Sequence, residues 1–196
     1  MKTKKVLILS GSILLLCVLL CGCIRITFTN LAKSSGYETL LDSTQQKRVV
    51  WINESDTLPN LPNDGNMYAI AAKHLLPIIN QYPKCIVYLW KPQCEVFPPI
   101  SLMQQMCDEK GAELLVVSSS FASAFEQNMD IRDHPLFIAN EHIYQEKRFE
   151  DASLRFEREL VGLSDDNKFP DSLWARMYVF KNGKFVGVDD WKQKKD

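Results

Sequence analysis

Residues 85–117 decide the fold. They begin with Cys-Ile-Val-Tyr-Leu-Trp at 85–90, and a nine-residue loop follows at 91–99. After the loop come Ile-Ser-Leu-Met-Gln-Gln-Met-Cys-Asp-Glu-Lys at 100–110, Gly111, and Ala-Glu-Leu-Leu-Val-Val at 112–117. Continuous apolar runs of strand length are typical of strands buried on both faces. The residues of the middle segment that share one apolar helical face are Ile100, Met103, Met106 and Cys107. Gly111 is a typical residue just after a helix. Strand, helix and strand in this order predict two parallel strands joined by a right-handed crossover.

Further elements follow toward the C-terminus. Two β-prone runs, 176–180 and 184–188, flank Asn182-Gly183, and Asn-Gly in this position is the strongest short-range signal of a β-hairpin. Apolar residues between 146 and 163 recur every three or four positions and predict an amphipathic helix. Residues 121–129 predict a shorter helix. These elements together predict an α/β fold with a mixed central sheet.

The region before residue 85 predicts one strand and one helix. Residues 48–52 form a short β-prone run, which a loop rich in Pro, Asn and Asp follows. Asn66 is a suitable N-cap for a helix that would run through Tyr68 to Ile78. Pro77 lies inside this helical pattern and should kink the helix or end it early.

Composition limits the function classes. The chain has 196 residues, 46% of them hydrophobic and 24% charged, which is ordinary for a globular domain. The first 22 residues carry three Lys and no acid, so their removal changes the net charge from −1 to −4. Such a balance argues against a nucleic-acid partner, because phosphate binding needs a basic surface. The Cys and His spacings match no zinc site, and we expect no metal and no cofactor.

The N-terminus has the anatomy of an export signal. Three lysines lie within the first five residues, an apolar stretch covers 6–20, and the segment ends Leu20-Cys21-Gly22-Cys23. The apolar stretch is short for a membrane span, which needs about 20 residues.

This ending resembles the lipobox of bacterial lipoproteins, in which a Leu and two small or neutral residues precede a Cys. In that family the signal is cut before the Cys, whose sulfur and new amino group receive acyl chains. The resemblance implies a signal peptide at 1–22 and lipidation of Cys23. The mixed polar composition that follows predicts a tether at 23–45, and a domain at 46–196 comes after it. The protein would then lie in the bacterial cell envelope, anchored by lipid on the extracytoplasmic side of a membrane. An uncleaved anchor helix and cleavage at another bond remain the alternatives.

Three cysteines remain beyond Cys23, namely Cys85, Cys94 and Cys107. An odd number leaves at least one unpaired within the chain. Cys85 lies in a predicted strand and Cys107 on the apolar face of a predicted helix, so we expect both in the core. Cys94 lies between that strand and that helix. The positive end of the helix dipole and its free N–H groups favour a thiolate, which predicts Cys94 as the reactive thiol.

The sequence Tyr-Leu-Trp-Lys-Pro-Gln-Cys at 88–94, the helix and strand after it, and Met-Tyr-Val-Phe-Lys-Asn-Gly at 177–183 together resemble the thioredoxin family. In that family an aromatic-rich strand ends in Trp, and Cys-x-x-Cys opens the next helix. The resemblance covers about residues 66–190. It implies a thioredoxin-like three-layer sandwich with a helical insertion near 130–165. It also implies a catalytic role for Cys94, with Trp90 and Pro92 shaping the site.

Two site positions differ from the family pattern. Phe97 stands where the family has its second cysteine, so Cys94 cannot form the usual disulfide with a Cys three residues on. Ala175 stands where the family has a cis-proline. A cis bond before a non-proline residue costs about 3 kcal/mol, so we expect a trans bond at Ala175.

Two functions therefore fit the sequence. In the first, Cys94 alone performs thiol–disulfide exchange, and an outside thiol resolves the mixed disulfide. In the second, the domain is a redox-inactive binding or assembly module of the envelope that recognises a protein partner. The retained Trp90 and Cys94 favour the first function, and the residues at 97 and 175 favour the second.

Overall fold

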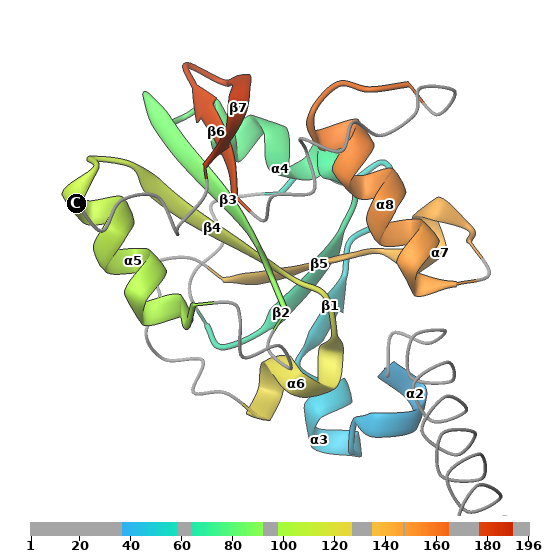
Figure 1. Ribbon diagram of the computed structural model, residues 1–196. Helices are drawn as coiled ribbons and strands as arrows, with labels where there is room; N and C mark the ends of the chain where they lie inside the picture. The colour runs from blue at the N-terminus through green and yellow to red at the C-terminus, as the bar shows by residue number, and fades with distance from the viewer. Residues whose placement is uncertain are drawn as a thin grey trace, which may run out of the picture.

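The computed structural model describes residues 37–58, 64–91, 98–126, 135–146, 148–164 and 177–189, with no description of the side chains of 38, 39, 122, 123 and 126. The elements in chain order are α2 (Tyr37–Leu40), α3 (Ser43–Gln46), β1 (Val49–Trp51), β2 (Met67–Ile70), α4 (Ala72–Ile79), β3 (Lys84–Trp90), α5 (Ile100–Glu109), β4 (Glu113–Ser118), α6 (Phe121–Glu126), β5 (Leu136–Ala139), α7 (Glu141–Tyr144), α8 (Phe149–Leu160), β6 (Met177–Lys181) and β7 (Lys184–Asp189) (Figure 1).

The strands form one mixed sheet in the order β1-β2-β5-β4-β3-β6-β7. The five strands from β1 to β3 in this order are parallel. The strand β6 pairs antiparallel with β3, and the edge strand β7 pairs antiparallel with β6. The predicted parallel pairing of β3 with β4 is confirmed, with Cys85 opposite Glu113 and Trp90 opposite Ser118. The predicted hairpin is confirmed as well, and its first strand β6 pairs with β3.

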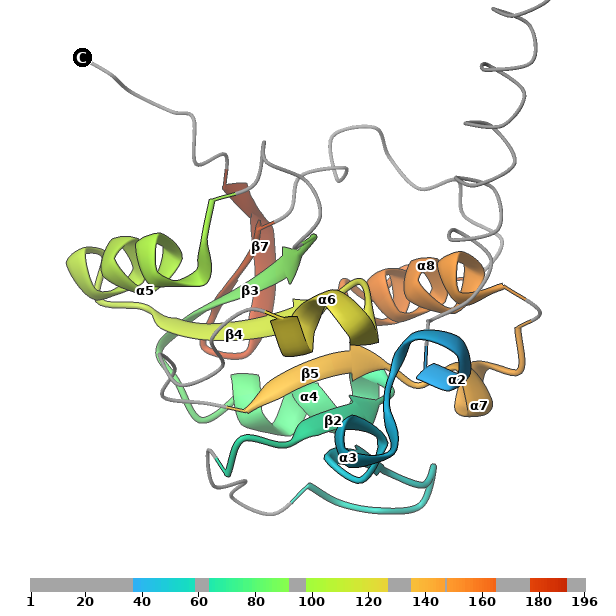
Figure 2. The ribbon, with the colours of Figure 1, turned by 90° about the horizontal axis from the view of Figure 1, so that it is seen from below.

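Helices cover both faces of this sheet, which makes the fold an α/β sandwich (Figure 2). Alternate residues of a strand point to opposite faces. Tyr88 of β3 donates a hydrogen bond to the carbonyl oxygen of Pro98 in front of α5, whereas Tyr178, which lies opposite the neighbouring Val87, donates to Glu157 of α8. The helices α5 and α8 therefore lie on opposite faces. The helix α4 packs against α8. The helix α6 lies in the same layer as α5, because the crossovers β3–α5–β4 and β4–α6–β5 run in the same direction across the sheet.

The core lies between these layers. All residues of β3 after Lys84 are buried, as are all four residues of β2 and of β5. The predicted apolar face of α5 is confirmed, since Met103 and Cys107 are fully buried in it. The predicted long helix is confirmed as α8, which is shorter than the 146–163 pattern and buries Phe149, Ala152, Phe156 and Leu160.

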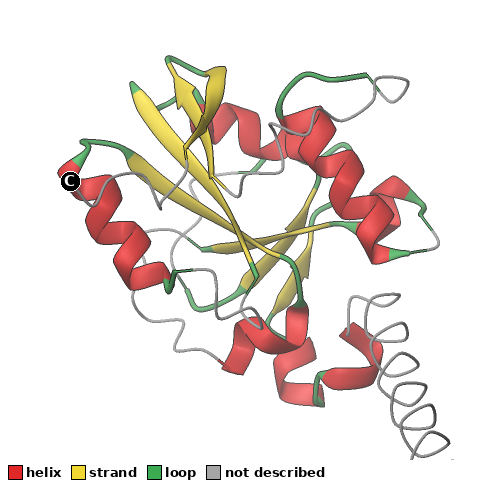
Figure 3. Ribbon diagram, viewed as in Figure 1, coloured by secondary structure: helices red, strands yellow, loops and turns green. Residues whose placement is uncertain are grey.

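The predicted helix from Asn66 is wrong in its first part. Residues Met67–Ile70 form the strand β2 between β1 and β5, and the helix α4 begins only at Ala72 (Figure 3). Pairing on both edges and burial on both faces favour a strand for this apolar run, and they override its helical periodicity. Pro77 lies inside α4, and the helix continues past it to Ile79, one residue beyond the predicted pattern, so the expected early end does not occur.

The region expected as a helical insertion also contains a strand. The strand β5 pairs with β4 on one side and β2 on the other, and it therefore forms part of the sheet centre. Its sequence Leu-Phe-Ile-Ala is too short to show a period. The helices α7 and α8 follow it. In the same way, the expected tether at 23–45 contains helical structure, namely α2 (Tyr37–Leu40) and all of α3 (Ser43–Gln46) except its last residue.

Candidate functional site

The strand β3 brings Trp90 to the edge of the sheet at which the parallel strands end. The Trp90 side chain is only 2% exposed, and its carbonyl oxygen accepts a hydrogen bond from the N–H of Ser119 at 2.9 Å. The chain leaves β3 through the half-buried Lys91. The position expected for Trp90, beside the loop that contains Cys94, is therefore fixed by β3 and by the end of β4.

The chain returns to the described part at Pro98, which is buried. The hydroxyl of Tyr88 donates to the Pro98 carbonyl oxygen at 2.8 Å, and the carbonyl oxygen of Pro99 accepts from the N–H groups of Leu102 and Met103 in the first turn of α5. Both ends of the segment that contains Cys94 are thus held against β3. The expected site residues Pro92, Cys94, Phe97 and Ala175 lie outside the described residues, as does Cys23.

The other two cysteines are confirmed as core residues. Both thiols are free and fully buried. Burial, and after it the nearby Glu113 carboxylate, raises the pKa of Cys85 to about 12. Burial raises the pKa of Cys107 to about 11, although the Lys110 charge opposes the shift. Neither thiol forms a thiolate at neutral pH, and neither is accessible, so neither has the properties of a nucleophile.

Two buried polar residues that the sequence analysis did not single out shape this same edge. Asn140 follows β5, accepts from the N–H groups of His142 and Ile143, and donates to the carbonyl oxygen of Ile52 at 2.9 Å. The hydroxyl of Ser118 donates to the Ser120 carbonyl oxygen at 2.9 Å. The rule that Asn often precedes a helix could have indicated Asn140. The polar groups of both side chains form hydrogen bonds to the backbone of this same chain, and these bonds hold the ends of β5 and β4 in place.

Side chains of α7 and α8 cap the N-terminus of α4. The N–H of Ala72 donates to the Tyr144 hydroxyl at 3.0 Å, and the N–H of Lys73 donates to a carboxylate oxygen of Glu159 at 3.0 Å. Tyr144 in turn donates to Glu159 at 2.6 Å. Burial, and then this carboxylate, raises the pKa of Tyr144 far above its ordinary value. The Glu159 charge occupies the place where a helix N-terminus would attract an anion.

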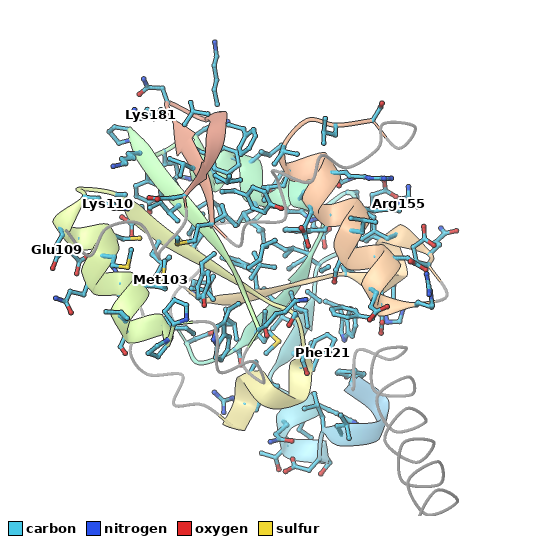
Figure 4. The ribbon with its side chains drawn as sticks, in the orientation of Figure 1. Met103, Glu109, Lys110, Phe121, Arg155 and Lys181 are labelled. Carbon is cyan, nitrogen blue, oxygen red and sulfur yellow. The ribbon has the colours of Figure 1, made fainter. Side chains whose placement is uncertain are left out.

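The strand order places a change of direction between β4 and β5. The helix α6 after β4 lies on the α5 face, whereas α8 after β5 packs on α4 at the other face. In open α/β sheets, ligands bind outside the carboxyl ends of strands at such a point. Figure 4 shows Phe121 at the start of α6 beside this edge. The carboxyl ends of β3, β4 and β5 are therefore the candidate functional edge of the sheet.

A search against protein-family models, curated proteins and solved structures found no match to the chain. Within the described ranges, no group of three or more His, Cys, Asp or Glu side chains could hold a metal ion. Among the helices of those same ranges, none has the length and apolar character needed to span a membrane.

Proposed function

We propose that the protein is a lipid-anchored, extracytoplasmic, thioredoxin-like protein that performs thiol–disulfide exchange through Cys94. The observation that carries the proposal is the burial of the other two cysteines of the domain, Cys85 and Cys107. Cys94 is the cysteine that the chain places between the carboxyl end of β3 and the start of α5. Cys94 precedes the first residue of α5 by six positions in the sequence. The proposal includes an approach of its thiol to the N-terminus of α5, which would favour the thiolate, the nucleophilic form.

The arrangement of the elements supports the thioredoxin-like part of this proposal. The β3–α5–β4 unit is parallel, and the β6–β7 hairpin lies antiparallel on the other side of β3. Trp90, the expected site-shaping residue, ends β3 and is buried at the functional edge. The added strands β5, β2 and β1 extend the sheet on the far side of β4.

The proposed reaction needs one cysteine of this protein. The Cys94 thiolate attacks one sulfur of a client disulfide, a new S–S bond forms, and the second client sulfur leaves with the electron pair as a thiolate. A thiolate of an outside dithiol protein or small thiol then attacks the mixed disulfide. Cys94 leaves as a thiolate, and the outside thiol is then the one joined in a disulfide bond. Phe97, at the position of the family's second cysteine, makes this outside thiol necessary.

The anchor is proposed from the sequence Leu-Cys-Gly-Cys at 20–23. Mass spectrometry of the mature N-terminus tests it, and the expected species begins at an acylated Cys23. An intact Met1, or cleavage at another bond, would contradict the anchor and leave the thiol chemistry to be judged separately.

Alkylation kinetics test the thiol. The folded protein is treated with iodoacetamide over a range of pH, and the labelled peptides are mapped. We expect Cys94 to react first, with a midpoint below the ordinary thiol value of about 8.5, and Cys94→Ser to abolish rapid labelling. Faster labelling of Cys85 or Cys107 would refute the proposal. Rapid labelling of Cys94 with an ordinary midpoint and no mixed disulfide with a model disulfide would favour the redox-inactive binding module instead.

A further inference from the structure

One continuous row of paired residues crosses five strands of the sheet, from Trp51 of β1 to Trp90 of β3. Trp51 pairs with Ala69, Ala69 with Ile138, Ile138 with Ser118, and Ser118 with Trp90. Directly paired residues point to the same face of a sheet, so Trp51 and Trp90 share a face. Four strand spacings, about 19 Å in all, separate them. Trp51 ends β1 at the same edge of the sheet as Trp90, but outside the surroundings of Trp90.

Aromatic rings gather around Trp51. The ring of Phe121, the first residue of α6, lies 5.7 Å from the Trp51 ring, and the ring of His142 in α7 lies 4.3 Å from it, measured between centroids. We call these three residues the aromatic surface. The Tyr37 ring of α2 packs edge-on against Trp51 at 5.1 Å and against Phe121 at 5.4 Å, so α2 lies beside α6 (Figures 1 and 2). Edge-on contact is an arrangement that aromatic pairs prefer. The aromatic surface therefore suits the ring of a tyrosine.

The helix that carries Tyr37 is a separable element. It has four residues, and a helix this short is not stable without tertiary contacts. Its last residue, Leu40, is 48% exposed. The Gln46 side chain of α3 donates to the carbonyl oxygens of Tyr37 at 3.4 Å and of Leu41 at 3.2 Å. The chain is fixed more firmly from Leu41 onward, because Leu41 is buried and Asp42 caps α3. A movement of α2 can therefore leave α3 in place.

We propose that the aromatic surface is a binding site for an aromatic side chain of a protein partner, and that Tyr37 occupies this site until the partner displaces α2. The present occupant indicates the chemistry of the ligand, which is an aromatic ring carried on a short segment of chain. Occupation by Tyr37 lowers the apparent affinity for the partner in proportion to the fraction of molecules in which α2 is displaced. This site is separate from the proposed thiol chemistry, and neither proposal depends on the other.

Fluorine NMR of the protein labelled with 5-fluorotryptophan tests the site. The chain has four tryptophans, and Trp51→Phe identifies the Trp51 resonance. N-acetyl-L-tyrosinamide is titrated into the wild-type protein and into Tyr37→Ala. We expect Tyr37→Ala to shift the Trp51 resonance and to bind this probe at least threefold more tightly than the wild-type protein, because a side chain on a short link competes at an effective concentration of the order of mM. An unshifted resonance, equal affinity in both proteins, or equally tight binding of N-acetyl-L-leucinamide to Tyr37→Ala would overturn the proposal.

A second pair of variants tests the displacement of α2 and decides the proposal if Tyr37→Ala does not fold. Leu40→Gly lowers the helix propensity of α2 at an exposed position and leaves the aromatic surface and Tyr37 unchanged. We expect Leu40→Gly to bind N-acetyl-L-tyrosinamide more tightly than the wild-type protein, and Leu40→Ala to match the wild-type protein. Wild-type affinity in Leu40→Gly would overturn the proposal.

Tyr82→Ala is the matched control, because Tyr82 is a half-buried tyrosine that precedes β3 at the opposite end of that strand from Trp90. It should change neither the Trp51 resonance nor the binding of the probe. The same changes in Tyr82→Ala as in Tyr37→Ala would assign them to a general loosening of the domain and would overturn the site.

Discussion

The hydroxyl of Tyr88 donates a 2.8 Å hydrogen bond to the carbonyl oxygen of Pro98, ten residues further along the chain. Both residues are buried. This bond joins the middle of β3 to the residue at which the chain returns toward α5. It therefore fixes the far end of the segment that contains Cys94, while β3 itself fixes the near end at Trp90.

Tyr88→Phe removes this bond and leaves a buried carbonyl oxygen without that donor. We expect the free energy of unfolding to fall by about 1–3 kcal/mol, the usual cost of leaving a buried polar group unsatisfied. Urea denaturation measures the change, and the alkylation rate of Cys94 in the folded protein reports on the site. A loss of stability below about 0.5 kcal/mol would show that the hydroxyl contributes little to this anchoring.

A second prediction concerns the hairpin turn between β6 and β7. Gly183 has a φ of +76°, and a Cβ at this position would lie 1.7 Å from the side-chain oxygen of Asn80 after α4. Gly183→Ala should destabilise the domain by more than about 1 kcal/mol, because the backbone conformation is strained for any residue with a Cβ. In an Asn80→Ala background the contact is removed but the strain stays, so the same substitution should cost less without becoming neutral. Full recovery in that background would show that the clash alone is responsible.

The sequence alone predicts those strands and helices whose local pattern agrees with their place in the fold. Cys85–Trp90 and Ala112–Val117 are long apolar runs, and Asn182-Gly183 is a specific turn, so the parallel pair and the hairpin could be predicted. The strand β2 could not, because Met67–Ile70 fits a helical period and becomes a strand only through its pairing with β1 and β5. The burial of Cys85 and Cys107 followed from their pattern, whereas the contact of Tyr37 with Phe121 joins residues too far apart in the chain for any local signal.

A third prediction concerns His74, in the first turn of α4. Its Nδ1 accepts a hydrogen bond from the N–H of Ala71 at 3.0 Å, and its side chain is buried. His74→Ala should destabilise the protein by about 1–3 kcal/mol, because this N–H loses its acceptor. His74→Gln should retain more of the stability, because Gln at this helix position can accept from the same N–H. Thermal or urea unfolding of both variants measures the difference, and equal losses would argue that packing of the ring, and not the hydrogen bond, is what matters.

The buried thiols predict the response of the protein to alkaline pH. In the folded state the pKa values of Cys85 and Cys107 are raised to about 12 and about 11, from a reference value of 9.0. The unfolded chain therefore releases these protons at a lower pH than the folded chain does. The stabilisation is fully present below pH 9 and is lost as the pH rises from 9 toward 11 and 12, by at most about 1.4 kcal/mol per pH unit for each thiol.

Urea unfolding at pH 8 and at pH 10 checks this prediction. The wild-type protein should lose stability between the two, and the Cys85→Ala/Cys107→Ala variant should lose markedly less, although its stability at pH 8 is lower because of the two cavities. Tyrosine ionisation also contributes toward pH 10 and above, and it is common to both proteins, so the difference between them isolates the thiols. The same loss in both proteins would mean that the two thiols ionise in the folded state as easily as in the unfolded chain, and it would remove the argument that leaves Cys94 as the nucleophile.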